Sequence, residues 1–178
     1  MFFIPGILIA IVTFPGVIVH ELAHLLACKW RGVAVFDVCF FQFKDPAGYV
    51  IHEEPKDFTS AFVISFGPFV LNSLLCILIC TPAMAPMRFF DITDPLSIVL
   101  MWLGISIGAH AFPSNHDAKN VWNMAKVAAK EGNLLAVLSF PIVVVLFVAN
   151  VLRFFWADVI YAYGVGVVLP GMLLKSLL

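Results

Sequence analysis

The stretch with the clearest chemical potential is His20-Glu21-Leu22-Ala23-His24, which lies inside a long apolar run. Side chains four positions apart share one face of a helix, so His20 and His24 can bind one zinc ion through their imidazoles. Glu21 lies beside them as a candidate general base for a zinc-activated water. The alternative is a polar seam that hydrogen-bonds neighbouring helices. Ionisable side chains are costly in a membrane helix, and this cost favours a functional site.

The composition indicates an integral membrane protein. The 178 residues are 62% hydrophobic and 12% charged, with a mean hydropathy of +1.04, whereas a soluble domain is about half apolar. The length suits one membrane domain and leaves little for an appended soluble domain. A net charge of −1 provides no general electrostatic case for nucleic acid. The first apolar run lacks the basic start of a signal peptide, so we expect it to be retained as a span.

The apolar runs predict an all-α polytopic protein with about five transmembrane helices. The first would cover residues 2–28 and bend near Pro15, because proline removes a backbone donor. Gly16 precedes His20 by one turn. It would either leave room beside the metal for water or substrate, or belong to a tolerated kink. The other expected spans are about 58–80, 96–111, 134–155 and 157–174, with a proline-rich loop at 81–95.

A β-hairpin or small sheet is expected between the first two spans. Residues 33–43 are rich in Val and Phe, residues 44–48 have the composition of a turn, and a strand-like pattern resumes at 49–52. The segment is too apolar for a hairpin in water, so we expect it against the helices or in the membrane interface. An exposed edge could pair with an extended peptide by strand addition, and the alternative is a structural flap.

The third expected span ends in a segment with three possible further ligands. Pro113 disfavours helix at the residue before it, so the helix should break there. Irregular backbone near a membrane is tolerated where it lines a cavity. His110, His116 and Asp117 surround this break. An amphipathic interfacial helix is then expected over residues 118–130.

Basic residues are unequally distributed about the expected spans. Only Arg88 and Arg153 fall on the side of the N-terminus. Cytoplasmic loops are enriched in Lys and Arg, so the hairpin side should be cytoplasmic and the N-terminus extracytoplasmic. The basic residues expected on the hairpin side are Lys29, Arg31, Lys44, Lys56, Lys119, Lys126, Lys130 and Lys175.

With these residues placed, the chain resembles the site-2 protease family of intramembrane zinc metalloproteases over about residues 1–130. That family carries H-E-x-x-H on its first core helix, G-P-x-x-N on its second and an Asn-Pro-Asp-Gly-type element on its third, with a β-hairpin or sheet between the first two. The first motif matches fully. Gly67-Pro68 matches, and Asn72 comes one residue late. In the third element Pro113 and Asp117 match in kind, whereas His110 stands in place of asparagine and Ala118 in place of glycine.

The resemblance implies a catalytic membrane core at 1–130, followed by two additional transmembrane helices at 131–178. Zinc would be held by His20, His24 and Asp117, with Glu21 as the catalytic base. The substrate would be a membrane-anchored protein with a transmembrane helix, cleaved within the lipid bilayer near its cytoplasmic face. Regulation would come from a membrane partner, and no nucleic acid is expected. The additional candidates for substrate binding or oxyanion stabilisation are His110, Asn72 and His116.

Two other function classes are compatible with parts of the sequence. A non-catalytic membrane adaptor could bind helices without cutting them, but a binding module needs no general base such as Glu21. A metal carrier could relay ions through the membrane by way of His20, His24, His110 and His116. Its path would be incomplete, because the last two expected spans contain no histidine.

Overall fold

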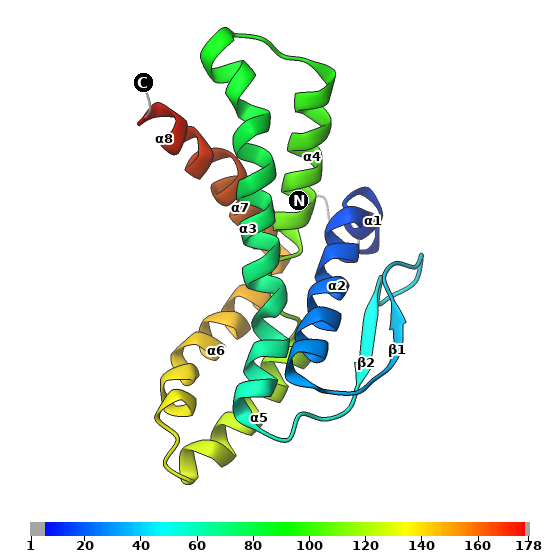
Figure 1. Cartoon of the computed structure of the whole chain (residues 1–178), viewed down its shortest axis with the longest axis vertical. Helices are drawn as coiled ribbons and strands as arrows, with labels where there is room; N and C mark the ends of the chain where they lie inside the picture. The colour runs from blue at the N-terminus through cyan, green and yellow to red at the C-terminus, as the bar shows by residue number, and fades with distance from the viewer. Residues whose placement is uncertain (1–5, 177–178) are drawn as a thin grey trace.

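The computed structural model describes residues 6–176 and is mostly helical, with one small antiparallel sheet between the second and third helices (Figure 1). This confirms the predicted fold in outline. The helices are α1 (Gly6–Val12), α2 (Phe14–Arg31), α3 (Phe58–Phe90), α4 (Pro95–Ala109), α5 (Asn115–Lys130), α6 (Leu134–Leu152), α7 (Ala157–Tyr163) and α8 (Leu169–Lys175). A 3₁₀ turn, Arg153–Phe155, follows α6, and a π-helical segment, Gly164–Val168, joins α7 to α8. The strands are β1 (Val35–Cys39) and β2 (Tyr49–His52).

The described residues contain three or four candidate membrane spans, fewer than the five predicted. Three are long and apolar enough by themselves: α3, Leu134–Phe155 and Ala157–Lys175. Helices α1 and α2 meet at Thr13 with a bend of 91°, so they form one broken span or a re-entrant loop. Helix α4 has 15 residues. At 1.5 Å per residue it is about 22 Å long, less than the roughly 30 Å of hydrocarbon. Residues 2–5 of the predicted first span lie outside the described residues.

The predicted proline-rich loop at 81–95 is wrong, because α3 continues to Phe90 and includes Pro82 and Pro86. Membrane helices tolerate internal prolines where neighbouring groups satisfy the freed carbonyls. The helix ends at Asp91, which has the left-handed φ of 54° and donates its backbone N–H to Pro86 O. With 33 residues, α3 is about 50 Å long and must tilt or extend beyond the hydrocarbon.

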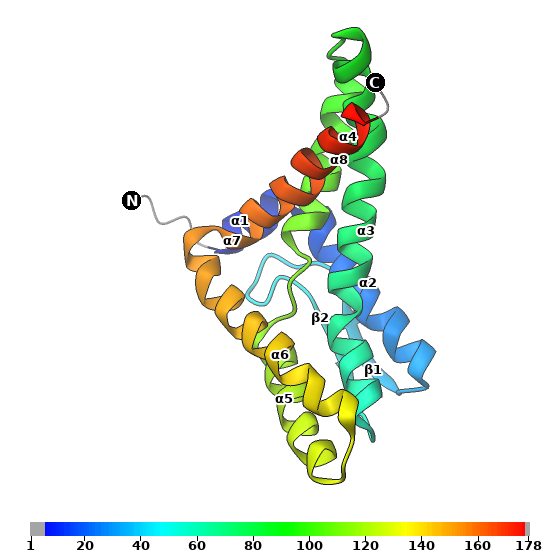
Figure 2. The same ribbon diagram turned by 90° about the vertical axis from the view of Figure 1, so that its left-hand side faces the viewer.

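Helix α3 is the central element, and α2, α4, α5 and α8 all pack against it (Figures 1 and 2). The predicted amphipathic helix is confirmed as α5, although it begins three residues earlier, because Ser114 provides the N-cap. Its apolar face joins α3 to α6. The buried side chains of this cluster are Phe58, Ala118, Val121, Ala125, Ala136, Val143 and Leu146.

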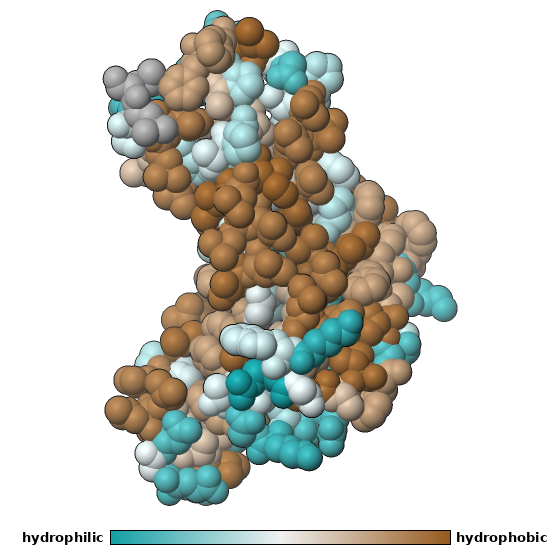
Figure 3. Space-filling model, in the orientation of Figure 1, coloured by the Kyte–Doolittle hydropathy of each residue, from teal (hydrophilic) through white to brown (hydrophobic). Residues whose placement is uncertain are grey.

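The last helices do not return to the hairpin end of the molecule. Figure 2 shows α6 and α7–α8 meeting at an angle and continuing toward the far end of α3. Gly171 in α8 lies near the Met84 sulfur, one turn before Arg88. Lys175 is therefore at the Arg88 end, and its predicted grouping with the hairpin-side lysines is wrong. Hydrophilic residues gather instead at the opposite end, as Figure 3 shows.

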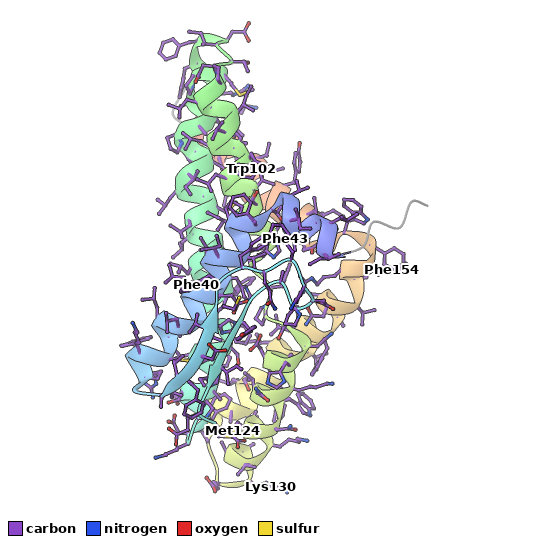
Figure 4. The ribbon with its side chains drawn as sticks, turned by 90° about the vertical axis from the view of Figure 1, so that its right-hand side faces the viewer. Phe40, Phe43, Trp102, Met124, Lys130 and Phe154 are labelled. Atoms are coloured by element: carbon purple, nitrogen blue, oxygen red, sulfur yellow. The ribbon has the colours of Figure 1, made fainter. Side chains whose placement is uncertain are left out.

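The predicted β-hairpin is confirmed and lies against the helices. Strands β1 and β2 pair antiparallel, with Cys39 opposite Tyr49 and an irregularity between Val35 and Asp37. The hairpin loop reaches α2 through aromatic contact, since the Phe41 ring centroid is 5.8 Å from that of Phe14. Figure 4 shows the hairpin and its labelled Phe43 beside the start of α2.

Candidate metal centre

His20 and His24 direct one nitrogen each toward the same point. Their Nε2 atoms are 3.2 Å apart, and their ring centroids are 4.8 Å apart. Two nitrogen ligands about 2.0–2.1 Å from a tetrahedral zinc ion are separated by roughly 3.3 Å. The two imidazoles lie on one helix face, as predicted, and their Nε2 atoms have the spacing that a shared zinc ion requires.

The other nitrogen of each ring donates to a backbone carbonyl on another part of the chain. His20 Nδ1 donates to His110 O at 2.6 Å, and His24 Nδ1 donates to Ile64 O at 3.0 Å. A carbonyl only accepts, so Nδ1 of each ring carries a proton, and in the neutral imidazoles both Nε2 atoms keep a lone pair. Two lone pairs then face each other, an arrangement that a cation between them would stabilise. Metal-binding histidines are commonly oriented by such a second hydrogen bond.

Asp117 completes the group. Its Oδ2 lies 3.7 Å from His24 Nε2, and one ligand atom from each of His20, His24 and Asp117 lies within 4.8 Å of the others. Ser114 orients this carboxylate, because its backbone N–H and hydroxyl donate to Oδ2 at 2.9 and 2.6 Å. The capping box that starts α5 therefore also positions the third possible ligand. Two imidazoles and one carboxylate form a group that can hold a metal ion, and the donor types suit zinc.

Glu21 and the three possible ligands share one cavity of about 770 Å³. Glu21 itself is buried, with 8% of its surface exposed. Helix α3 contributes one wall, and α5 and the hairpin contribute two others. Figure 4 shows the labelled Met124, one of the α5 lining residues, opposite the hairpin. The lining from the hairpin and the segment after it consists of Pro46, Gly48, Tyr49, Val50, Ile51, His52, Glu54 and Pro55.

The hairpin loop closes directly over Glu21. A Cβ atom added at Gly48 would come within 2.7 Å of Glu21 Cγ and 3.0 Å of Phe40 O. The absence of a side chain at residue 48 thus allows this contact.

The two strands are also joined by a side-chain hydrogen bond. The Tyr49 hydroxyl donates to Asp37 Oδ2 at 2.9 Å, and this hydrogen bond raises the pKa of Tyr49.

The other predicted site residues have different positions. His116 is exposed and lines the cavity, but it is not part of the ligand group. The His110 ring turns away, with Nε2 2.7 Å from Thr13 Oγ1, while its carbonyl orients His20. Asn72 lies outside the cavity lining and donates to Ile107 O and His110 O. Sequence reasoning missed the backbone role of His110, because only the packing of α4 on α2 creates it.

Gly16 contributes to helix packing and not to the cavity lining. A Cβ atom there would overlap Ser106 O and approach the His110 ring at 2.6 Å. The hypothesis that Gly16 leaves room beside the metal is therefore wrong. Its hydrogen side chain lets α2 approach the end of α4, which brings His20 to the His110 carbonyl.

Gly16→Ala should destabilise the protein and weaken metal binding together. The added methyl group must push α2 from α4, and overpacking of this kind costs about 1–3 kcal/mol. Thermal unfolding and zinc affinity of the detergent-solubilised protein test this expectation. Gly164→Ala is the matched control, because an added Cβ there meets nothing within 4 Å. Equal behaviour of the two variants would contradict the packing role of Gly16.

Gly48→Ala should leave zinc binding intact and lower cleavage of a membrane substrate. The methyl group would displace the hairpin from Glu21 without touching a ligand, and a misplacement of about 1 Å can cost 10²-fold in rate. Zinc content and turnover should be measured on the same preparation, again beside Gly164→Ala. Unchanged turnover would show that the hairpin contact has no functional role.

Comparisons with protein families, curated proteins and solved structures found no match to this chain. The candidate centre therefore stands on its own geometry. One cavity contains the facing Nε2 atoms of His20 and His24 and the buried Glu21, all from α2. It also contains the Asp117 carboxylate from α5, which lies close to His24.

Proposed function

We propose that this protein is an intramembrane zinc metalloendopeptidase of the site-2 protease type. The observation that carries the proposal is the pair of Nε2 atoms of His20 and His24, which lie 3.2 Å apart in the cavity that Glu21 also lines, while each ring directs Nδ1 to a backbone carbonyl. A polar seam would place a donor against an acceptor, whereas two neutral imidazoles in this arrangement place two acceptors against each other. Zinc fits this group, with Asp117 as its third ligand and a position left for water.

The roles of the protein residues follow from their positions. When bound, zinc supplies a Lewis acid that makes water more acidic and polarises the scissile carbonyl. Glu21 follows His20 on the same helix and lines the cavity, so its carboxylate can take a proton from water and later deliver it to the leaving amine. The burial of Glu21 beneath the hairpin limits its contact with bulk water. Asp117 offsets part of the charge of a bound cation.

The substrate backbone would be bound as an extended strand along β2. All four residues of β2, Tyr49–His52, line the cavity, and β1 is its only strand partner in the described part of the chain. The free edge of β2 thus offers N–H and C=O groups beside the metal group. A helical substrate must unwind before attack, because its peptide bonds are internally satisfied. Strand addition supplies new hydrogen bonds to the unwound segment.

The substrate class follows from the place of the cavity. It lies at the hydrophilic end of the molecule, where α2 ends in Lys29 and Arg31 and α5 ends in Lys130 (Figure 3). By the positive-inside rule this end would be cytoplasmic. The substrate would then be a membrane-anchored protein whose transmembrane helix is cut near the cytoplasmic face. Access to it would be regulated by a partner membrane protein.

The proposal is tested by comparing membrane proteomes of cells that express the wild-type protein or Glu21→Gln. A substrate should accumulate uncut in the variant and be cut by purified wild-type protein in detergent. Chelation should stop this cleavage, and added zinc should restore it. Zinc transport into vesicles without any cleavage would favour a metal carrier. Substrate capture without cleavage by the zinc-loaded wild-type protein would favour a non-catalytic adaptor.

A further inference from the structure

We infer that Asn72 is a positioning residue for the metal centre, because it holds the carbonyl that orients His20. Its side chain is 0% exposed, and Nδ2 donates to Ile107 O and His110 O, both at 3.1 Å. His110 O also accepts from His20 Nδ1 at 2.6 Å. The contacts run from α3 through the end of α4 to α2. The inference rests on the proposed metal site and is independent of proteolysis.

The direction of the Asn72 amide follows from its neighbours. Both are carbonyl oxygens, which only accept, so Nδ2 and not Oδ1 must face them. On its other side, Asn72 Oδ1 is buried and has no hydrogen-bond partner among residues 6–176. Leaving an acceptor unsatisfied in a buried position costs free energy. Leucine has a similar size and would avoid that cost, so the amide is useful here only through its donor.

The end of α4 requires such a donor. The last carbonyls of a helix have no partner in their own ladder. Ile107 O and Gly108 O accept from the N–H groups of His110 and Ala111. His110 O lies beyond this turn, and two side chains, Asn72 and His20, satisfy its two lone pairs. Without the Asn72 amide, His20 Nδ1 would be the remaining side-chain donor to His110 O among the described residues.

Helix α3 therefore helps to orient the imidazoles of both His20 and His24. His24 is oriented directly by Ile64 O of α3, and His20 is oriented through Asn72 and His110. Figure 1 shows α4 and α2 each beside α3, with the end of α4 close to the first turns of α2. Loss of the Asn72 amide should therefore loosen one ligand and leave the other in place. The expected result is a weaker metal site in a protein that still folds.

The first test measures zinc affinity of the full chain in detergent by competition with a chelator. Asn72→Leu and Asn72→Asp remove the donor at similar volume, and each should weaken binding about 10–100-fold, the range for outer-shell partners of a metal. Ser73→Ala is the matched control. Ser73 neighbours Asn72 but contacts Tyr161 and Phe69 O. Asn72 variants that bind zinc as tightly as Ser73→Ala would overturn the inference.

The second test measures directly which ring nitrogen of His20 carries the proton. It needs no metal, and its wild-type measurement needs no variant. Nitrogen-15 spectra of the metal-free wild-type protein should show His20 protonated on Nδ1, and Asn72→Leu should shift part of that population to Nε2. A wild-type His20 protonated on Nε2 would refute the inference. Neither test uses cleavage. A protein that passes both and cuts no substrate would refute the proposed protease function alone.

Discussion

Glu21→Gln should leave zinc in the protein and abolish cleavage. Glutamine is nearly isosteric, so the buried contact with Gly48 is kept, but it cannot accept a proton from water at neutral pH. One acid–base group contributes about 10²–10⁴-fold to a rate. We expect a loss at the upper end of this range or beyond it, because Glu21 would also orient the water. Zinc content and substrate turnover should be determined on the same preparation.

The control for this substitution is Glu53→Gln, which makes the same chemical change at an exposed residue outside the cavity lining. Its turnover should equal that of the wild-type protein. Turnover of Glu21→Gln within an order of magnitude of the control would remove Glu21 from the mechanism. Loss of zinc in Glu21→Gln would instead indicate that this carboxylate is a ligand.

Asp117→Asn should reduce zinc occupancy and cleavage together. Asp117 Oδ2 lies 3.7 Å from His24 Nε2, and a neutral amide is a far poorer ligand than a carboxylate for a dication in a site shielded from water. Removing an outer-shell partner already costs about 10–100-fold in affinity, so loss of a direct ligand should exceed 100-fold. Chelator competition measures the affinity, and cleavage of the same substrate measures the activity.

Asp94→Asn separates this effect from helix capping. Asp94 is the N-cap of α4 and accepts from Ser97 N and Ser97 Oγ, whereas Asp117 is the N3 residue of α5 and accepts from the backbone N–H and hydroxyl of the N-cap Ser114. Asparagine caps a helix about as well as aspartate, so Asp94→Asn should retain zinc and activity. Equal zinc loss in both variants would show that the Asp117 effect is not a ligand effect.

His110→Ala supplies a second contrast for the third ligand. The substitution removes a ring that contacts Thr13 Oγ1 and leaves the backbone carbonyl that accepts from His20. Zinc should therefore remain bound. Zinc that survives Asp117→Asn but disappears in His110→Ala would favour a three-histidine site in place of the proposed group.

Features that depend on neighbours a few residues apart could be predicted from the amino-acid sequence. Apolar runs and helix periodicity predicted the helices, and the spacing of His20 and His24 placed both imidazoles on one face. The hairpin was predicted from the Val- and Phe-rich residues 33–43, the turn composition of 44–48 and the strand-like residues 49–52. Pro113 predicted the break that lets Asp117 turn back toward α2, although the N-cap proved to be Ser114. These patterns are local, so one chain suffices to recognise them.

Features that depend on residues distant in the sequence became visible only in the folded chain. Helix α3 could continue through Pro82 and Pro86, although these residues predicted a loop by local rules. Gly16 proved to be a packing position because Ser106 and the His110 ring lie against it. Asn72 and the His110 carbonyl are connected to His20 of the candidate metal centre through contacts that join three helices. Backbone carbonyls have no residue-specific signal, so no sequence pattern can show which imidazole they orient.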